Sequence, residues 1–399
     1  MKFRLTLILL LLVNVPLSAR DIDLDAIYLK PESRIYTDII SAKEKIYTGI
    51  SSLFIDSSVI FSVWSGGDEI LYIKEFRGIN IIYLYSKGTL EKREIGRFPG
   101  TVTAAVNNSR GNLVTFKSIF YNDEAEAESR NIHIDLVTGK ICEEKSGSLF
   151  LDFSAHPSTR EIIKQGRDGI FRRDPFTGSS SKLVSSGEYS DMQCQGQPVI
   201  AHISPDGKSR LLVCGSGGSY SARLLRAGNR SDIIGISSAG DIRWINNNRF
   251  VYRSGGAGDY SVRIYDTNKG SSFQLISGTM NPDINFSERA GLITCLDNQI
   301  INIFTSDLSS RIETGIEGEE TSFSPDGRKL ISIYRGKLYV TSLTMLEKYQ
   351  IEIRRNAATL LELYRKAEKS KSDWENAFTP EYLDKKITQY QKFLNSGSK

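Results

Sequence analysis

The tetrapeptide Ser-Pro-Asp-Gly occurs twice in this chain of 399 residues, each time before an apolar run. The first copy, Ser204–Gly207, precedes Leu211–Val213. The second copy, Ser324–Gly327, precedes Leu330–Ile333. Pro presets φ for a turn, Asp bonds to nearby backbone and Gly accepts a positive φ, so each copy predicts a tight turn between two strands. A turn that recurs in the same context indicates a repeat architecture.

Weaker copies of this turn bring the number of periods to seven. They are centred near positions 56, 109, 157, 247 and 289, and the complete copies are centred near 205 and 326. The successive steps of roughly 37 to 53 residues are close to the length of a four-stranded propeller blade.

Two further kinds of turn fall inside each period. Gly-rich breaks, such as 215–218 and 255–258, separate two strands, and turns that start with Asp, such as Asp135–Lys140 and Asp174–Gly178, precede another strand. Three turns per period give four strands per period. The sequence therefore predicts an all-β fold, a seven-bladed β-propeller of four-stranded antiparallel blades, over residues 52–353.

Two ways of closing the ring are compatible with the sequence. The last blade has candidates for all four of its strands if Tyr349–Ile353 forms the outer one. Alternatively, the N-terminal segment 20–51, continued by Ser52–Phe54, supplies that outer strand through Lys45–Phe54 and latches the propeller.

The segment Thr321–Leu343 reads Ser-Pro-Asp-Gly-Arg, then a short break and Leu-Tyr-Val, and it resembles the TolB-like repeat. This is a WD-like propeller repeat of bacterial periplasmic proteins. Ala201–Leu225 fits the same pattern, and the resemblance extends over roughly residues 52–353. It implies a propeller that works through protein contacts in the cell envelope. The resemblance is to the repeat, because no TolB N-terminal domain is expected before the blades and a helical tail is expected after them.

The first 19 residues have the three parts of a secretory signal. Met1–Arg4 is basic, Leu5–Val13 is apolar, and Ala19 is a small residue at which a peptidase can cut. The apolar part is shorter than the ~20 residues of a membrane span, and no cysteine near Ala19 offers a lipoprotein anchor. We therefore expect a periplasmic or secreted protein, with no membrane insertion after signal cleavage.

Charge and cysteine content exclude several classes of function. With 51 basic and 47 acidic residues, the chain is too balanced to suggest nucleic acid as its main partner. Cys142, Cys194, Cys214 and Cys295 include no C-x-x-C pair, which argues against a zinc site or a dithiol redox motif. One disulfide, Cys194–Cys214, is compatible with export; the other interpretation places Cys214 and Cys295 as small buried residues on strands.

The segment 354–399 changes character, since turn signals give way to helix formers. Thr379–Glu381 has a cap residue followed by Pro, as at a helix start. An apolar stripe then runs at steps of four, three and four residues. The sequence predicts two helices that pack on the propeller or serve as a partner helix, through Leu383, Ile387, Tyr390 and Leu394.

Sequence motifs of catalysis are missing. There is no Gly-x-Ser-x-Gly, no His-Glu-x-x-His, no phosphate-binding glycine loop and no dinucleotide fingerprint. The three histidines, His133, His156 and His202, are interpreted as structural or exposed. The residues expected on inner strands are not suited to general acid–base catalysis or metal binding. They are Thr103–Ala105, His202, Arg243 and Asn285. We therefore expect no catalytic residues, no cofactor and no metal.

One constellation of carboxylates is a candidate binding site. The connections between blades, which share one rim of the disc, carry Glu188, Asp191, Asp241, Asp283, Glu317, Glu319 and Glu320. A ring of carboxylates at a channel mouth can hold a cation or a basic peptide, but the simpler interpretation is a solvated rim. The acidic run Asp123–Glu128 is interpreted as a solvated loop.

These observations favour an exported, non-enzymatic binding or scaffold protein with protein partners. The alternative is a propeller hydrolase of the lactonase or glycosidase type, with an axial carboxylate site. A third reading is an assembly component docked through its tail.

Overall fold

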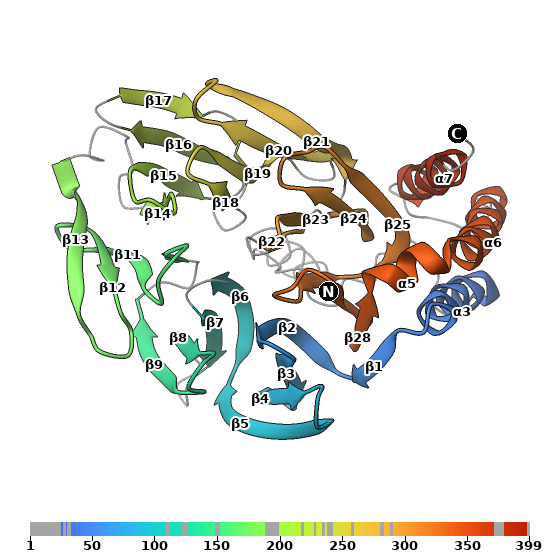
Figure 1. Cartoon of the computed structure of the whole chain (residues 1–399), viewed down its shortest axis with the longest axis horizontal. Coiled ribbons are helices and arrows are strands. Elements are labelled where there is room, and N and C mark those ends of the chain that lie inside the picture. The colour runs from blue at the N-terminus through green and yellow to red at the C-terminus, as the bar shows by residue number, and fades with distance from the viewer. Residues whose placement is uncertain are drawn as a thin grey trace, which may run out of the picture.

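The computed structural model describes residues 25–26, 29, 33–108, 112–121, 126–147, 152–187, 199–216, 219–226, 229–233, 236–237, 242–256, 259–279, 283–287, 290–370 and 379–396. Within these residues, seven four-stranded antiparallel sheets stand around a common axis (Figure 1). The predicted seven-bladed propeller is confirmed.

The blades follow one another along the chain, and in blades 1 to 6 the first strand is the innermost. Blade 1 contains β2 (Val59–Gly66), β3 (Glu69–Phe76), β4 (Ile79–Ser86) and β5 (Glu91–Pro99). Blade 2 contains β6 (Thr101–Asn108), β7 (Leu113–Tyr121), β8 (Ala127–Asp135) and β9 (Ile141–Ser146). Blade 3 contains β10 (Phe153–Ala155), β11 (Ile162–Gly166), β12 (Gly169–Arg173) and β13 (Ser180–Ser185). Blade 4 contains β14 (Val199–Ile203), β15 (Ser209–Ser216), β16 (Ser219–Arg226) and β17 (Asn229–Ile233).

The remaining blades continue this order. Blade 5 contains β18 (Arg243–Asn246), β19 (Arg249–Gly256), β20 (Asp259–Asp266) and β21 (Ser271–Thr279). Blade 6 contains β22 (Ile284–Ser287), β23 (Leu292–Asp297), β24 (Ile300–Thr305) and β25 (Arg311–Glu317). Blade 7 contains β26 (Glu320–Phe323), β27 (Lys329–Tyr334), β28 (Lys337–Ser342) and, from the start of the propeller, β1 (Leu53–Asp56).

The ring is closed by this N-terminal strand. β1 pairs antiparallel with β28, so that Leu53 lies opposite Val340. Asp56 then ties the strand to blade 1, because Lys74 Nζ lies 2.8 Å from its Oδ1 and Tyr72 donates to its Oδ2 at 2.8 Å. The interpretation of Tyr349–Ile353 as the outer strand is wrong, since β1 occupies that edge of β28 and Gln350–Ile353 is helical.

The position of β1 also shows that the turn predicted near Asp56 connects different strands from the other six predicted turns. Six of the seven predicted turns lie between the first and second strands of a blade, but the turn near Asp56 joins β1 to β2. In blade 1 the turn between the first and second strands is Gly67–Asp68.

The longer helices of the described part of the chain lie outside the ring, beside β25, β28 and β1 (Figure 1). They are α3 (Arg34–Gly49), α5 (Leu343–Lys348), α6 (Gln350–Lys369) and α7 (Thr379–Asn395). Ser33 caps α3 by accepting a hydrogen bond from the Tyr36 amide at 3.2 Å. The propeller therefore ends at Ser342 and not at residue 353, and the helical part includes residues on both sides of the propeller sequence.

Buried apolar clusters fill six of the seven interfaces between neighbouring blades. The cluster between blades 6 and 7 continues into the helices through Leu360, Tyr364, Leu383 and Tyr390. The helices therefore share the core of the propeller.

The described cysteines lie on strands. Cys295 is buried and Cys142 half-buried, and both are free thiols. Cys214 is disulfide-bonded. Cys194, the partner expected from the sequence, lies outside the described residues.

Candidate functional site

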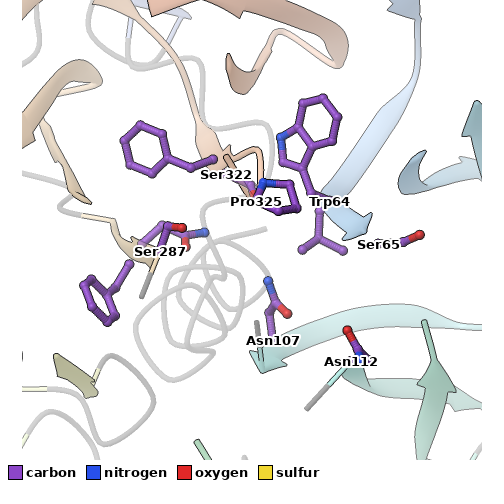
Figure 2. A pocket seen from close by; sticks show the side chains of 11 residues that line it. Trp64, Ser65, Asn107, Asn112, Ser287, Ser322 and Pro325 are labelled. Atoms are coloured by element: carbon purple, nitrogen blue, oxygen red, sulfur yellow. The ribbon is translucent and has the colours of Figure 1, made fainter. Parts of the chain in front are cut away.

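A pocket opens at the propeller axis where four inner strands end (Figure 2). These strands are β2, β6, β22 and β26, from blades 1, 2, 6 and 7. The pocket has an empty volume of about 480 Å3, part of it open to solvent. Its lining consists of Val63, Trp64, Ser65, Asn107, Asn112, Asn285, Phe286, Ser287, Ser322, Phe323 and Pro325.

The described lining residues are uncharged, and their polar groups are amides, hydroxyls and the Trp64 indole. Asn285 is fixed by its side-chain amide, which donates to Thr321 O at 2.6 Å. Trp64 is 6% exposed, and its Nε1 has no hydrogen-bond partner among the described residues. The same holds for Asn107 Oδ1, which is also buried. A buried polar group without a partner costs free energy, so a donor and an acceptor are available here for a ligand.

No catalytic pair is found among the described residues of the pocket. These lining residues include no His, Cys, Asp, Glu, Lys or Arg, so the serine hydroxyls among them have no described base beside them. The arrangement suits binding of an uncharged polar group next to aromatic rings.

A serine and a lysine do meet elsewhere, between blades 2 and 3. Lys117 Nζ donates to Ser146 Oγ at 2.7 Å and to Asp152 Oδ1 at 2.7 Å. Burial lowers the pKa of Lys117, and the charge of Asp152 opposes this shift. Because the ammonium is ion-paired and both Lys117 and Ser146 are buried, this contact reads as structural and not as a nucleophile with its base.

The predicted carboxylate ring is described only in part. Glu188, Asp191 and Asp241 lie outside the described residues. Asp283 precedes β22, and Glu320 begins β26 and is half-buried. Within the described ranges, no group of three or more His, Cys, Asp or Glu side chains could hold a metal ion.

Two of the expected rim carboxylates are interior. Glu319 is buried, and its Oε1 accepts a hydrogen bond from the Arg335 amide at 2.9 Å. Glu317 is 3% exposed and belongs to a network of buried charges. The prediction that Glu317 and Glu319 line a solvated rim is wrong, because both side chains are buried and residues of α3 and α7 contact Glu317.

We call this network the clasp: Asp25, Lys43, Glu317 and Lys386. Lys43 on α3 contacts both Asp25 and Glu317. Lys386 on α7 donates to Glu317 Oε1 at 2.8 Å and to Asn298 O at 2.6 Å. Two positive and two negative groups balance, so the clasp joins the N-terminal segment, the propeller and the tail without a net buried charge.

Three tyrosines complete the hydrogen bonds of the clasp. Tyr364 and Tyr382 each donate to Asp25 Oδ1 at 2.8 Å. Tyr390 donates to Glu317 Oε1 at 2.7 Å. Each buried carboxylate therefore accepts hydrogen bonds from helices that are far apart in the sequence.

The clasp shifts the pKa values of its members in different directions. Burial would raise the pKa of Asp25, but the charges of Lys43 and Lys386 outweigh it, so this pKa is below its usual range. For Lys43, burial is outweighed by two carboxylates and the pKa is raised. Lys386 contacts only one carboxylate, so burial prevails and lowers its pKa.

The predicted partner stripe on α7 faces the protein itself. Leu383, Ile387 and Tyr390 are buried in the cluster shared with the propeller, and Leu394 packs partly against it. Helix α7 therefore packs on the chain's own α6 and on β25 of blade 6.

Sequence reasoning missed most of the pocket. Of its lining residues, only Asn285 was among the inner-strand candidates. A signal that could have found some of them is their position at the end of an innermost strand, just before the turn to the second strand. Trp64, Ser65, Asn107 and Ser287 occupy such positions.

Comparisons with known proteins show the fold alone. No family model matches the chain, and no curated protein does. Among solved structures, TolB from Acinetobacter baumannii is 18% identical over 56% of this chain and 55% of that chain, with a TM-score of 0.37. The tricorn protease is 12% identical over 86% of this chain and 39% of that one, with a TM-score of 0.45. The Pyrococcus horikoshii acylaminoacyl peptidase is 12% identical over 64% and 44%, with a TM-score of 0.43.

The chain is thus similar to TolB and to other propeller proteins, and it spans about half the length of the TolB structure. None of the helices in the described part of the chain has the length and apolarity required to cross a membrane.

Proposed function

We propose that this protein is an exported, non-enzymatic binding protein that holds a protein partner at the axial pocket. The observation that carries the proposal is the pair of buried polar atoms in the pocket, Trp64 Nε1 and Asn107 Oδ1, which have no partner among the described residues. A buried donor and acceptor next to aromatic side chains provide specific contacts to an uncharged segment of a partner.

The fold supports a scaffold role. The closed ring and the clasp hold the four pocket-forming strands in place, and a rigid site loses less entropy on binding than a mobile one. The TolB-like repeat seen in the sequence belongs to proteins of the cell envelope, which is the location that we propose.

Export is supported by the sequence of residues 1–19 and by Cys214. Disulfides persist mainly in oxidising compartments, and Cys214 is disulfide-bonded. N-terminal sequencing of protein from the envelope fraction tests this step; we expect Arg20 as the first residue. An intact Met1 would contradict export.

Site-specific crosslinking tests the binding site. A photoreactive amino acid in place of Asn112, at the pocket mouth, should give a discrete adduct with one envelope protein. The matched control replaces Phe76, which is 59% exposed at the opposite end of blade 1. An adduct at both positions, or at neither, would contradict a partner site at the pocket.

The variant Trp64→Phe tests whether the partner uses the indole donor of Trp64. Trp64→Phe keeps an aromatic ring but removes the unpartnered donor, so we expect weaker crosslinking from position 112. Because Trp64 packs in the cluster between blades 7 and 1, the smaller ring should also cost about 1 kcal/mol of stability. Unchanged crosslinking in this variant would show that the indole donor is not used.

Activity-based profiling on esters, peptides and glycosides tests the absence of enzymatic function, and we expect no turnover above background. If turnover appeared, the first residues to replace would be Asp241, Asp283 and Glu320. Loss of that turnover in the variants would favour the hydrolase alternative.

A further inference from the structure

The interface between blades 2 and 3 differs in chemistry from the other six. Each of the other interfaces contains a buried apolar cluster. Among the described residues, none of these clusters spans blades 2 and 3. The buried apolar side chains Leu113, Phe153 and Ile162 lie on the facing sides of these two blades but belong to none of the six clusters.

Polar and charged side chains occupy the centre of this interface instead. In a strand, alternate residues share a face, and directly paired residues on neighbouring strands point the same way. The cross-strand pairs Thr115 with His133, Lys117 with Asn131, and Asn131 with Glu144 therefore put one face of blade 2 against blade 3. We call this interface the polar seam: Thr115, Lys117, Asn131, His133 and Glu144 with Asp152, Lys164 and Arg173.

Ion pairs hold the seam together. Lys164 Nζ lies 2.7 Å from Glu144 Oε1, and Arg173 Nη1 lies 2.8 Å from Glu144 Oε2. Lys117 pairs with Asp152, as described above. Arg160 of blade 3 also lies 3.2 Å from Asp135 of blade 2 and 2.9 Å from Asp174. Four described cations therefore face four carboxylates, and these charges balance when His133 is neutral.

His133 lies within this set with no solvent exposure. Its Nδ1 is 3.0 Å from Thr115 Oγ1, whereas its Nε2 has no partner among the described residues, and neither has the neighbouring Asn131 Oδ1. The groups that face it are Glu144 and the Cys142 thiol from β9, Lys117 from β7, Lys164 and Arg173 from blade 3, and Asp152.

Burial is the main reason that the pKa of His133 falls to about 4. Lys164 and Arg173 lower it further, while Glu144 and Asp152 oppose them. A proton on His133 would leave one excess positive charge in an interface where the described residues form no apolar cluster.

We propose that the polar seam is an acid-sensitive joint of the ring, at which blades 2 and 3 separate first when His133 becomes protonated. The other six interfaces keep their apolar clusters at any pH, because burial of apolar surface does not depend on titration. Opening exposes His133 and restores its ordinary pKa of about 6.5. Between about pH 6.5 and pH 4 the open form therefore binds more protons than the closed form, so a fall in pH favours opening.

Hydrogen exchange of the full-length protein, corrected for the intrinsic rate at each pH, tests the proposal. Peptides from β7–β9 and β10–β12 should open on the order of fifty-fold more often at pH 4.5 than at pH 7. Peptides from blades 5 and 6 should change much less. Equal changes in all blades would overturn the joint.

Two variants assign the effect to its residue. His133→Gln removes the titrating group and should abolish most of the pH dependence at the seam. The matched control is His202→Gln, which changes a buried histidine on β14 in blade 4. This variant should keep the pH dependence of exchange at the seam. A seam that opens in acid equally in His133→Gln would contradict the proposal.

A second measurement does not need the variants to fold. Because the chain has three histidines, their ring signals can be followed by NMR in the unmodified protein. We expect one ring to stay neutral down to about pH 4 and to titrate together with the loss of amide protection at the seam. The proposal would be wrong if all three imidazoles titrated near pH 6.5 while the amides of the polar seam stayed protected from exchange.

Discussion

Lys386 Nζ lies 2.8 Å from Glu317 Oε1, although one residue belongs to the last helix and the other to the outer strand of blade 6. Both side chains are almost completely buried. This contact, together with Lys43 and Asp25, explains why the helices are part of the folded core and not an appendage.

Lys386→Met should destabilise the protein by about 3–5 kcal/mol, since it removes one partner from a buried ion network and leaves the carboxylates undercompensated. Chemical denaturation measures the change. Lys392→Met, on the exposed side of the same helix, is the control and should change stability by less than about 0.5 kcal/mol. Equal stability of the two variants would mean that the clasp does not hold α7.

Gly315→Ala should be more harmful than an ordinary glycine replacement in a turn. Gly315 has φ of +68°, and an added Cβ would lie 2.7 Å from the ring of Phe393 on α7. Gly270 has a similar φ of +62° with open space around it. Gly270→Ala is therefore the control, and its loss of stability measures the backbone strain without a steric clash. We expect Gly315→Ala to cost about 2 kcal/mol more, measured by denaturation, because of overpacking. Identical costs would show that α7 can move away without loss.

Asp56→Asn should weaken the closure of the ring by about 2 kcal/mol, since hydrogen bonds to a charged group are worth more than neutral ones. Burial opposes ionisation of Asp56, but hydrogen bonds from Lys74 and Lys92 outweigh it and lower its pKa. This stabilisation is therefore present above about pH 4 and is lost as the pH falls further. Denaturation at pH 7 and pH 3 measures it. Asp38→Asn on the exposed side of α3 should have little effect at either pH.

Global stability should fall as the pH decreases from about 6.5 to about 4. His133 has a folded-state pKa of about 4, so its burial as a neutral ring contributes a loss of about 3 kcal/mol across this window. Denaturant midpoints at pH 7 and pH 4.5 should differ less in His133→Gln than in the unmodified protein; a smaller difference remains in the variant because burial also lowers the pKa of His156. A flat profile in the unmodified protein would contradict the depressed pKa.

The propeller could be predicted because its signals are local. Ser204–Gly207 and Ser324–Gly327 encode turns within four residues, and their spacing sets the number of blades. The pocket was harder to predict, because Trp64, Asn107, Ser287 and Ser322 come from strands that meet only when the ring closes. Their local sequence places most of them next to a turn, but it does not show which of the seven strand ends meet at one pocket.

The sequence by itself determined the repeat, the number of blades, the order of strands within most blades and the helical character of the tail. Each of these depends on turn chemistry or apolar periodicity over a few residues. The tertiary structure decided which segment completes blade 7, where Glu317 and Glu319 lie, and which blade interface is polar. These features depend on pairings between distant parts of the chain, such as Leu53 with Val340 and Lys43 with Glu317. Burial and the balance of charge at such contacts exist only once the ring has closed.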